Sequence, residues 1–469
     1  MAITINNSNT LSLLNILNRI AAQQEKTLTQ LSTGSRINRG SDDPADLIAL
    51  RSLDTELIAV DASIVSNQRT DAILNVADSA LTEVASLLNE IQNLAQSSAN
   101  EAGLSASEVA ANQAQIDTAI DALDRIIRTT SFNGKKLLDG SYGINVNGVT
   151  AADITNVRVF SRDTDATSNA ISVEISSAAQ RATVTGFGTT SATAETTISI
   201  QGKLGTALIT VSIGENLSAV TARINNATST TGVVASQTGA TAAIGLRSQD
   251  FGSTALVRVS VLSGDTTNFN AGNDTGVDAG ITVNGQTVGV DGLDVNFNSN
   301  GLSIQFSIST AFNASAAGTT STFTVDSSGG ATFQLGTDST TRVTIGIDGL
   351  YSQQLGSAVL GRLSSLRSGG TNSLLNNPGQ ASGIATKAAE QVAQTQGRIG
   401  GFQKFQVRTA LNTQNATKAG LEAARSVIGD VDYATATAEL NRQQVLLQMS
   451  ISLLGLANQQ SSQVLSLLR

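Results

Sequence analysis

The stretch PADLIALRSLDTELIAVDASIVSNQRTDAILNVADSALTEVASLLNEIQNLAQ (44–96) decides the fold of this chain. Its apolar residues recur three and four positions apart, as in Leu81, Val84 and Leu88, which is the spacing of an amphipathic helix with a coiled-coil seam. Asp43 and Pro44 supply an acidic cap and a proline at the first helical position. We predict one long helix here, and its apolar stripe must be buried against a partner because such helices are marginal alone.

Each end of the chain predicts a further amphipathic helix, over residues 8–32 and about 433–468. The first is expected to end at Gly34. The seam residues that we assign to it are Leu14, Leu17, Ala21, Leu28 and Leu31. Those that we assign to the second helix are Leu440, Leu447, Ile451, Leu454, Leu465 and Leu468. The economical solution pairs these two helices with each other. It also pairs the helix from residue 44 with a polar antiparallel helix over 384–428.

Apolar side chains outside these stripes lack a partner within the chain. They include Leu13, Ile16, Leu446, Leu453 and Leu456. Surplus apolar surface of this kind is typical of a protein that binds other molecules. We therefore interpret the chain as a structural subunit that polymerises through its helical ends.

The middle of the chain, from about 140 to 370, changes to a β pattern. Val, Ile and Thr alternate with polar residues between Asn-Gly turns, as in GINVNG (143–148) and GITVNG (280–285), so hairpins are expected. One short helix is predicted at about 216–229. The fold class is therefore α+β: a nested helical coiled-coil rod built from both chain ends, with an inserted β-rich outer domain.

The composition argues against an enzyme. The 469 residues contain no His, Cys or Trp, which excludes Ser-His-Asp and Cys-His catalysis and thiolate or imidazole metal sites. Asp42, Asp43, Asp430 and Asp432 lie near helix starts, where carboxylates act as caps. We predict no catalytic residue, no metal site and no cofactor. The net charge of −9 also makes nucleic acid a poor candidate for a partner.

Two further segments bear on targeting. The N-terminus MAITINNSNTLSLLNILNRI lacks the charged, apolar and small-residue regions of a cleavable secretory signal. Residues 443–468 carry no charge, but glutamine and asparagine interrupt the apolar run that a membrane span requires. We expect no membrane insertion.

Four motifs resemble those of the bacterial flagellins, the subunits of the flagellar filament. They are LSTGSRINRGSDDPADLIAL (31–50), SFNGKKLLDG (131–140), DVDYATATAELNRQQVLLQ (430–448) and LANQQSSQVLSLLR (456–469). The resemblance covers about 180 N-terminal and 90 C-terminal residues. Residues 198–236 of the middle also look like an insertion repeat found in many flagellins.

This resemblance implies three domains. The first is an inner domain of paired terminal helices (1–43 and 430–469). The second is a helical shell domain with a small β region (44–175 and 380–429). The third is a β-rich, surface-exposed outer domain (176–379) that contains the insertion-type repeat.

The resemblance also implies a function and partners. Members of this family polymerise into an extracellular filament, a homopolymer that bacteria use for swimming. Each subunit is exported unfolded through the flagellar type III gate and is assembled beneath a cap, beyond the hook-filament junction proteins. A chaperone holds the C-terminal helix before export, and the corresponding contacts here are Leu446, Leu447, Ile451, Leu454 and Leu465.

One stretch departs from the strongly recognised flagellins at the contact for an innate immune receptor. The matching residues NEIQNLAQ (89–96) carry Glu90 and Gln92 where those flagellins carry arginines, although Leu94 is kept. Reversal of a contact charge costs affinity, so we expect weak recognition.

Two other functions share parts of this pattern. A hook-filament junction protein has the same plan of terminal helices, but it usually lacks the full shell signature and the LSLLR ending at 465–469. A flagellin whose middle domain also acts as an adhesin is the second alternative. Surface Ser and Thr could in addition accept glycans, at sites that composition does not select.

Overall fold

The computed structural model describes residues 8–98, 104–162, 168–189, 191–237, 243–299, 301–357 and 360–467. The chain divides into two compact units, Met1–Ser66 with Ala410–Arg469 and Asn67–Thr409. The helices are α1 (Ser8–Thr33), α2 (Pro44–Ser98), α3 (Ala106–Thr129), α4 (Leu217–Asn226), α5 (Thr228–Thr231), α6 (Thr310–Asn313), η1 (Ser339–Thr341), η2 (Leu363–Leu366), α7 (Pro378–Phe402), η3 (Gln403–Val407), α8 (Arg408–Gly429) and α9 (Tyr433–Leu467). No helix among the described residues is both long and apolar enough to span a bilayer.

The predicted helix boundaries follow from local chemistry. Gly34, just after α1, has a φ of +70°, the left-handed conformation that ends helices. The side chain of Asp43 accepts a hydrogen bond from the Asp46 N–H at 3.1 Å, so it caps α2. Ser105 and Glu108 form the capping box of α3. The expectations for Gly34 and Asp43 are confirmed.

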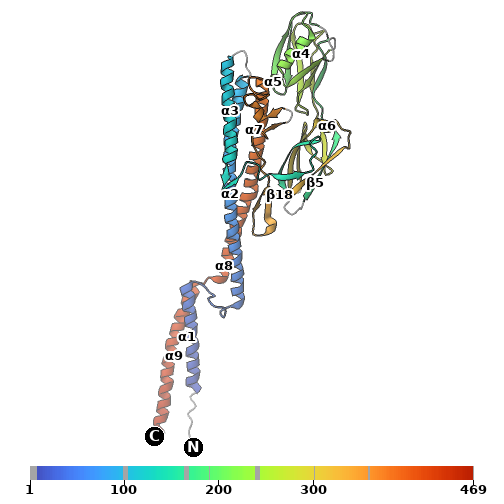
Figure 1. Ribbon diagram of the computed structural model, residues 1–469. Coiled ribbons are helices and arrows are strands. Elements are labelled where there is room, and N and C mark those ends of the chain that lie inside the picture. Colours follow the sequence, from blue (N-terminus) through green and yellow to red (C-terminus); the bar gives the residue numbers. More distant parts are fainter. Residues whose placement is uncertain are drawn as a thin grey trace. The chain divides into compact units, whose positions relative to one another are not determined.

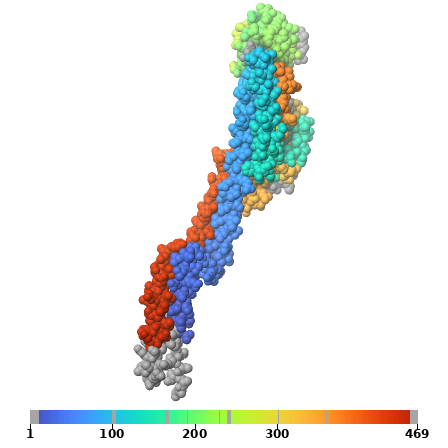
Figure 2. Space-filling view, turned by 60° about the vertical axis from the view of Figure 1, so that its left-hand side comes forward, coloured from blue at the N-terminus to red at the C-terminus, as the bar shows by residue number. Residues whose placement is uncertain are grey.

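In the first unit, the two terminal helices α1 and α9 pack side by side (Figures 1 and 2). The connectors beside them are pinned together, because Arg36 donates two hydrogen bonds to the Ile428 carbonyl and lies 2.5 Å from Asp46. Ion pairs also join α8 to the first part of α2: Lys418 to Asp61 at 2.8 Å, and Arg425 to Asp54 at 2.7 Å. The helix pairing predicted from the sequence is confirmed.

In the second unit, α3 and α7 lie beside the rest of α2 (Figure 1). The buried stripe of α2 keeps a heptad spacing through Leu74, Leu81 and Leu88, all fully enclosed. Ile116, Ile120, Leu123 and Ile127 of α3 are equally buried. These residues form a closed helical core.

The middle of the chain contains only antiparallel strand pairs among the described residues, and their order in the sheets is β1-β2, β6-β10-β9, β12-β11-β7-β8, β14-β13-β5-β18-β3, β15-β16-β17-β4-β20-β19 and β21-β22. The strands are β1 (Ser131–Phe132), β2 (Lys135–Lys136), β3 (Ile144–Asn147), β4 (Ile154–Arg162), β5 (Ser168–Ser177), β6 (Thr183–Phe187), β7 (Thr196–Gly202), β8 (Thr206–Val211), β9 (Val233–Gln237), β10 (Ile244–Ser248), β11 (Leu256–Ser263), β12 (Gly272–Thr275), β13 (Gly280–Val283), β14 (Gln286–Thr287), β15 (Gly289–Asp291), β16 (Asp294–Ser299), β17 (Leu302–Ile308), β18 (Thr320–Gly329), β19 (Ala331–Gln334), β20 (Arg342–Ile345), β21 (Gly356–Ser357) and β22 (Gly361–Arg362). The α+β class with a β-rich insertion is confirmed.

Two Asn-Gly pairs that look alike in the sequence behave differently. Asn284 and Gly285 take positive φ angles and close a tight hairpin between β13 and β14. Gly148 also has a positive φ, but β3 before it pairs with the distant β18. The hairpin expected at residues 143–148 is therefore absent from the described strands, because a long-range strand outcompetes the local one.

The strands enclose two separate hydrophobic cores. One is built by β3–β5 and β13–β18 around residues such as Ile171, Ile304 and Phe323. The second is inserted between β5 and β13 and includes Ile198, Val220 and Phe269, with the predicted short helix as α4 and α5. The insertion starts and ends at one place, because Ser177 of β5 is the pairing partner of Gly280 of β13.

The helix expected over residues 384–428 is interrupted. The structure has α7, then one π-helical turn, η3, and then α8. The Arg408 N–H donates to the carbonyl of Gln403, five residues back, which is the π-helical hydrogen bond. The prediction of one uninterrupted helix was wrong, because periodicity alone does not register one additional residue in a turn.

Candidate assembly surfaces

The face that α1 turns toward α9 differs from the stripe that the sequence suggests. Leu17 and Leu31 are half-buried, as are Leu13, Ile16 and Ile20 on the same side of the helix. Leu14 and Leu28 lie on the outer side, with 44% and 47% of their surfaces exposed. Both side chains therefore lie outside the seam of this helix pair, because apolar residues on two sides of α1 offer more than one stripe, and their assignment as assembly residues stays a prediction.

The same division occurs on α9. Leu440, Leu447 and Leu454 are half-buried on the inner side, with Gln443 and Ser450 between them. Ile451, which we expected in the seam, is 54% exposed, and the buried Gln443 lies in the seam. The side chain of Leu465 and the whole of Leu468 fall outside the described residues.

Polar side chains occupy half of this inner seam. Thr27, Gln443 and Ser450 are all buried. Gln443 donates to Glu439 at 3.1 Å, but its Oε1 atom has no hydrogen-bond partner among the described residues. A buried acceptor without a partner costs free energy, so the two-helix pair is weaker than an apolar seam would make it.

The outer side of α9 is apolar from Leu446 to Leu456. Its exposed residues lie three and four positions apart, which places them on one face of the helix. They are Leu446, Met449, Leu453 and Leu456, with 40% to 59% of their surfaces exposed, and Val445 lies next to them. This row forms a second stripe, which we call the outer α9 stripe (Leu446, Met449, Leu453 and Leu456).

Sequence reasoning missed further exposed apolar residues in the first unit. Ile48 and Ile58 on α2 are 72% and 71% exposed, and Val427 on α8 is 83% exposed. Their spacing was hidden because the buried heptad of α2 dominates the pattern. Together with the outer α9 stripe, they give this unit an unusual amount of uncovered apolar surface.

The stretch assigned to an immune receptor lies on α2 in the second unit. Glu90 is exposed and Leu94 is half-buried. Gln92 donates a hydrogen bond to Thr386 of α7 at 3.0 Å, so this side chain already serves the contact between the two helices. Glu90 is therefore more accessible to solvent than Gln92.

Among the chaperone candidates, Leu446 and Ile451 are exposed, whereas Leu447 and Leu454 face α1. A partner that binds all of them must displace α1 from α9. Such a partner would therefore bind the unpaired C-terminal helix.

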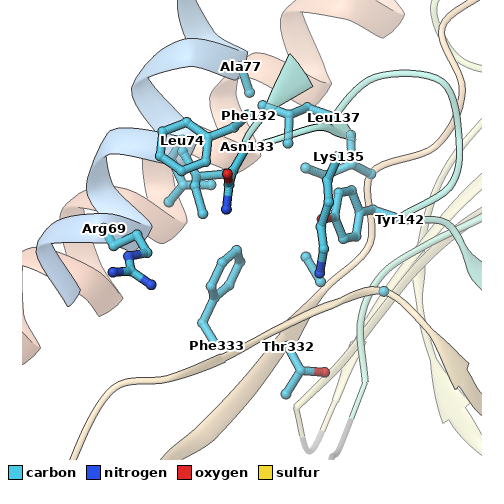
Figure 3. Close-up of a pocket in the computed structure, with 14 residues that line it drawn as sticks. Arg69, Leu74, Ala77, Phe132, Asn133, Lys135, Leu137, Tyr142, Thr332 and Phe333 are labelled. Atoms are coloured by element: carbon cyan, nitrogen blue, oxygen red, sulfur yellow. The ribbon is translucent and has the colours of Figure 1, made fainter. Parts of the chain in front are cut away.

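The second unit contains a cavity of about 430 Å³ between α2, the β1-β2 hairpin and β19 (Figure 3). Phe132, Tyr142 and Phe333 line it, and Arg69 and Lys135 approach it from opposite sides. It holds no nucleophile next to a base. In the described part of the chain, no three carboxylates lie close enough together to hold a metal ion.

A buried charge lies near the base of the same unit. Burial raises the pKa of Asp348 to about 6, although Arg158 and Arg398 act against this shift. Burial also lowers the pKa of Arg398 to about 10, and its guanidinium lies 3.2 Å above the Phe160 ring. The Oδ2 atom of Asp348 has no hydrogen-bond partner in the described structure. These groups form a structural charge cluster.

Comparison with known proteins identifies both helical ends. The bacterial flagellin N-terminal helical region matches residues 5–143, and the bacterial flagellin C-terminal helical region matches residues 383–468. Flagellin of Bacillus subtilis is 32% identical over 166 residues, which are 34% of this chain and 53% of that protein. Polar flagellin A of Vibrio parahaemolyticus is 30% identical over 144 residues, 30% of this chain and 38% of that protein. The matches thus span less than two thirds of either relative.

A solved structure of flagellar hook associated protein-3 from Legionella pneumophila is 11% identical to the chain. The alignment covers 84% of this chain and 99% of that one, with a TM-score of 0.27.

Proposed function

Because the chain belongs to the bacterial flagellin family through both of its helical ends, we propose that it is a structural, non-enzymatic subunit of an extracellular flagellar filament used for swimming. The observation that carries this proposal is the uncovered apolar surface of the first unit, above all the outer α9 stripe. A lone molecule leaves these side chains in water, whereas a polymer buries them. Identical subunits related by a non-closing rotation form an open helical filament.

The first experiment compares the full chain with a version that lacks residues 1–40 and 433–469. Both are incubated with ammonium sulfate, which strengthens apolar burial, and then examined by sedimentation and negative-stain electron microscopy. We expect filaments from the full chain only. Filaments from both would disprove assembly through the terminal helices, and soluble monomers from both would favour the junction-protein alternative.

A matched pair of point variants tests the outer α9 stripe itself. Leu453→Asp places a charge on this stripe, and Leu208→Asp makes the same change at an exposed leucine of β8. We expect the first variant to remain monomeric and the second to polymerise like the parent. Equal polymerisation of both would remove the stripe from the assembly surface.

We further propose the partners that this function requires: the type III export gate, a filament cap, the hook-filament junction proteins and a chaperone for residues 433–469. The exposure of Leu446 and Ile451 supports the chaperone assignment, because a partner can reach both before α1 is displaced. Co-purification with the chaperone should fall for Leu446→Ser and stay unchanged for the exposed control Gln448→Ser. Equal recovery of both variants would contradict these contacts.

Weak binding to the innate receptor forms a separate proposal. Glu90 supports it, since this exposed acid stands where strongly recognised flagellins carry arginine. In a binding assay on the monomer, Glu90→Arg should bind the receptor more tightly than the parent, and Glu83→Arg on the same helix should not. Parent binding at the level of strongly recognised flagellins would overturn the proposal.

A further inference from the structure

The π-helical turn η3 lies where α7 passes into α8 and contacts the neighbouring α2. Gln403 and Val407, its first and last residues, are both buried. The side chain of Gln403 donates to Asp71 and to Asn75, each at 2.8 Å. Arg408, which follows the turn, lies 3.9 Å from the same Asp71. One carboxylate thus meets residues from both ends of the turn.

Polar contacts show the register in which α7 and α8 pack against the antiparallel α2. Before the turn, the contact Gln396–Thr82 is followed by Gln403–Asn75, so seven residues on α7 match seven on α2. After the turn, Lys418–Asp61 is followed by Arg425–Asp54, again seven against seven.

Between these two sets of contacts the register changes by one residue, at η3. From Gln403 to Arg408 the chain advances five residues, whereas their partners Asn75 and Asp71 are four apart. The π-turn therefore absorbs one additional residue, as expected from its wider hydrogen-bonded loop. Without it, every residue of α8 would occupy the position that its successor holds now.

We propose that η3 is a register joint with two states. In the state described above, α8 packs one residue out of step with α7. In the second state η3 relaxes to α-helix, so α8 turns about its axis and presents a neighbouring face to α2. The exchange concerns the pairing of α8 with the first part of α2, and it does not depend on the proposed filament.

The sequence of α8 can support the second face. In the second state, each contact position of α8 against α2 would be taken by the residue that now precedes it in the chain. These preceding residues are small or apolar: Ala410, Thr413, Thr417, Gly420, Ala424 and Val427. Val427 is 83% exposed in the present register, and the second register would bury it against α2. This change offsets the loss of two exposed ion pairs, which contribute little to stability.

Π-turns concentrate at functional positions of helices, and a packed interface with two discrete registers behaves as a switch rather than a spring. The neighbouring Gly400 and Gly401 also favour this arrangement. A Cβ atom at either position would meet no atom within 4 Å, so these two glycines themselves make no close contact that fixes the helix.

The test measures distances between two nitroxide labels by electron paramagnetic resonance in the full-length monomer. The chain has no cysteine, so introduced cysteines carry the labels. Asp61→Cys with Lys418→Cys reports on α8, and Thr82→Cys with Gln396→Cys reports on α7 as the matched control. We expect two distances from the first pair and one from the second. A single distance from the first pair would overturn the proposal.

Deletion of Gly401 supplies the decisive variant, because it removes the additional residue. The α8 pair should then give only the distance of the present register, and circular dichroism should show no loss of helix. Retention of both distances after the deletion would also overturn the proposal.

A second variant keeps the test decisive if the deletion disturbs folding. Val427→Asp charges a residue that is buried only in the second register, so the second distance should disappear while the first remains. Ala416→Asp, at an exposed position outside both faces, should keep both distances. If Val427→Asp also keeps both distances, the second register is wrong.

Discussion

The α1·α9 pair and the α2·α3 core are both helical, but they bury their apolar side chains to different degrees. In the core, Leu74, Leu81 and Leu88 are fully enclosed. In the terminal pair, the seam alternates leucine with Gln443 and Ser450, and the outer α9 stripe is uncovered. The comparison teaches that the core is closed within a single molecule, whereas the terminal pair leaves apolar surface uncovered.

The largest expected effect distinguishes these regions by stability. Leu88→Ala should lower the free energy of unfolding by about 3 kcal/mol, because it removes buried atoms and leaves a cavity in a closed core. Leu453→Ala, in the outer α9 stripe, should change it by less than about 0.5 kcal/mol in the monomer. Urea denaturation followed by circular dichroism measures both. Equal losses of unfolding free energy from the two variants would show that Leu453 is packed as well as Leu88 in the monomer.

Asp348 tests whether a buried carboxylate makes the stability of the second unit depend on pH. Burial raises the pKa of Asp348 in the folded chain to about 6, above the usual aspartate value of 3.8, so protonation stabilises the fold. This stabilisation is fully present at low pH and is lost as the pH rises from 4 through 6. Asp348→Asn should therefore be more stable than the parent at pH 8, by up to about 3 kcal/mol, and equal to it near pH 4.

Denaturation at several pH values gives the result. Asp326→Asn is a suitable control, because hydrogen bonds from Ser328 and Ser327 lower the pKa of this carboxyl instead. A variant at position 348 that loses stability at every pH would show that the carboxylate is needed as a charge partner of Arg158 and Arg398.

Replacement of one leucine in the outer α9 stripe should alter assembly more than folding. Leu453→Ser removes about 1.5 kcal/mol of apolar burial per contact, which corresponds to roughly a tenfold rise in the critical concentration. Sedimentation of a dilution series measures this concentration. An unchanged value would place the stripe at the surface of the polymer.

The smallest expected effect concerns the polar seam. Gln443→Leu removes a buried acceptor without a partner, so the terminal pair should become more stable by about 1 kcal/mol. Amide hydrogen exchange in α9 should then slow, while exchange in α3 remains as before. Faster exchange in α9 would mean that the hydrogen bond from Gln443 to Glu439 is structurally required.

The sequence was informative where one local signal decides the outcome. The caps at Asp43 and Ser105 and the stop at Gly34 were predictable, since each depends on a few neighbouring residues. The sides of α1 and α9 were less predictable, because apolar residues surround both helices and the period allows more than one stripe. Leu14, Leu28 and Ile451 are therefore exposed rather than in the seam of the helix pair, and their role in assembly stays a prediction.

The features that sequence reasoning missed have a common cause. The π-turn depends on one residue more than an α-helical turn holds, and the four-residue steps from Ile399 to Gln403 to Val407 were its only sign. The pairing of β3 with β18 and the closure of a second core depend on contacts between distant residues. The proposed domain boundaries stay predictions for the same reason.

The inserted core between β5 and β13 has a consequence for how this surface can diversify. Ser177 and Gly280 are partners in neighbouring strands, so the chain leaves the sheet and re-enters it at adjacent positions. Gln180 and Val277 form one more bridge at the same place. A different domain with adjacent ends could be grafted there without a shift in the register of the sheet below. Variation can then act on the inserted cassette while selection holds the rest of the subunit constant.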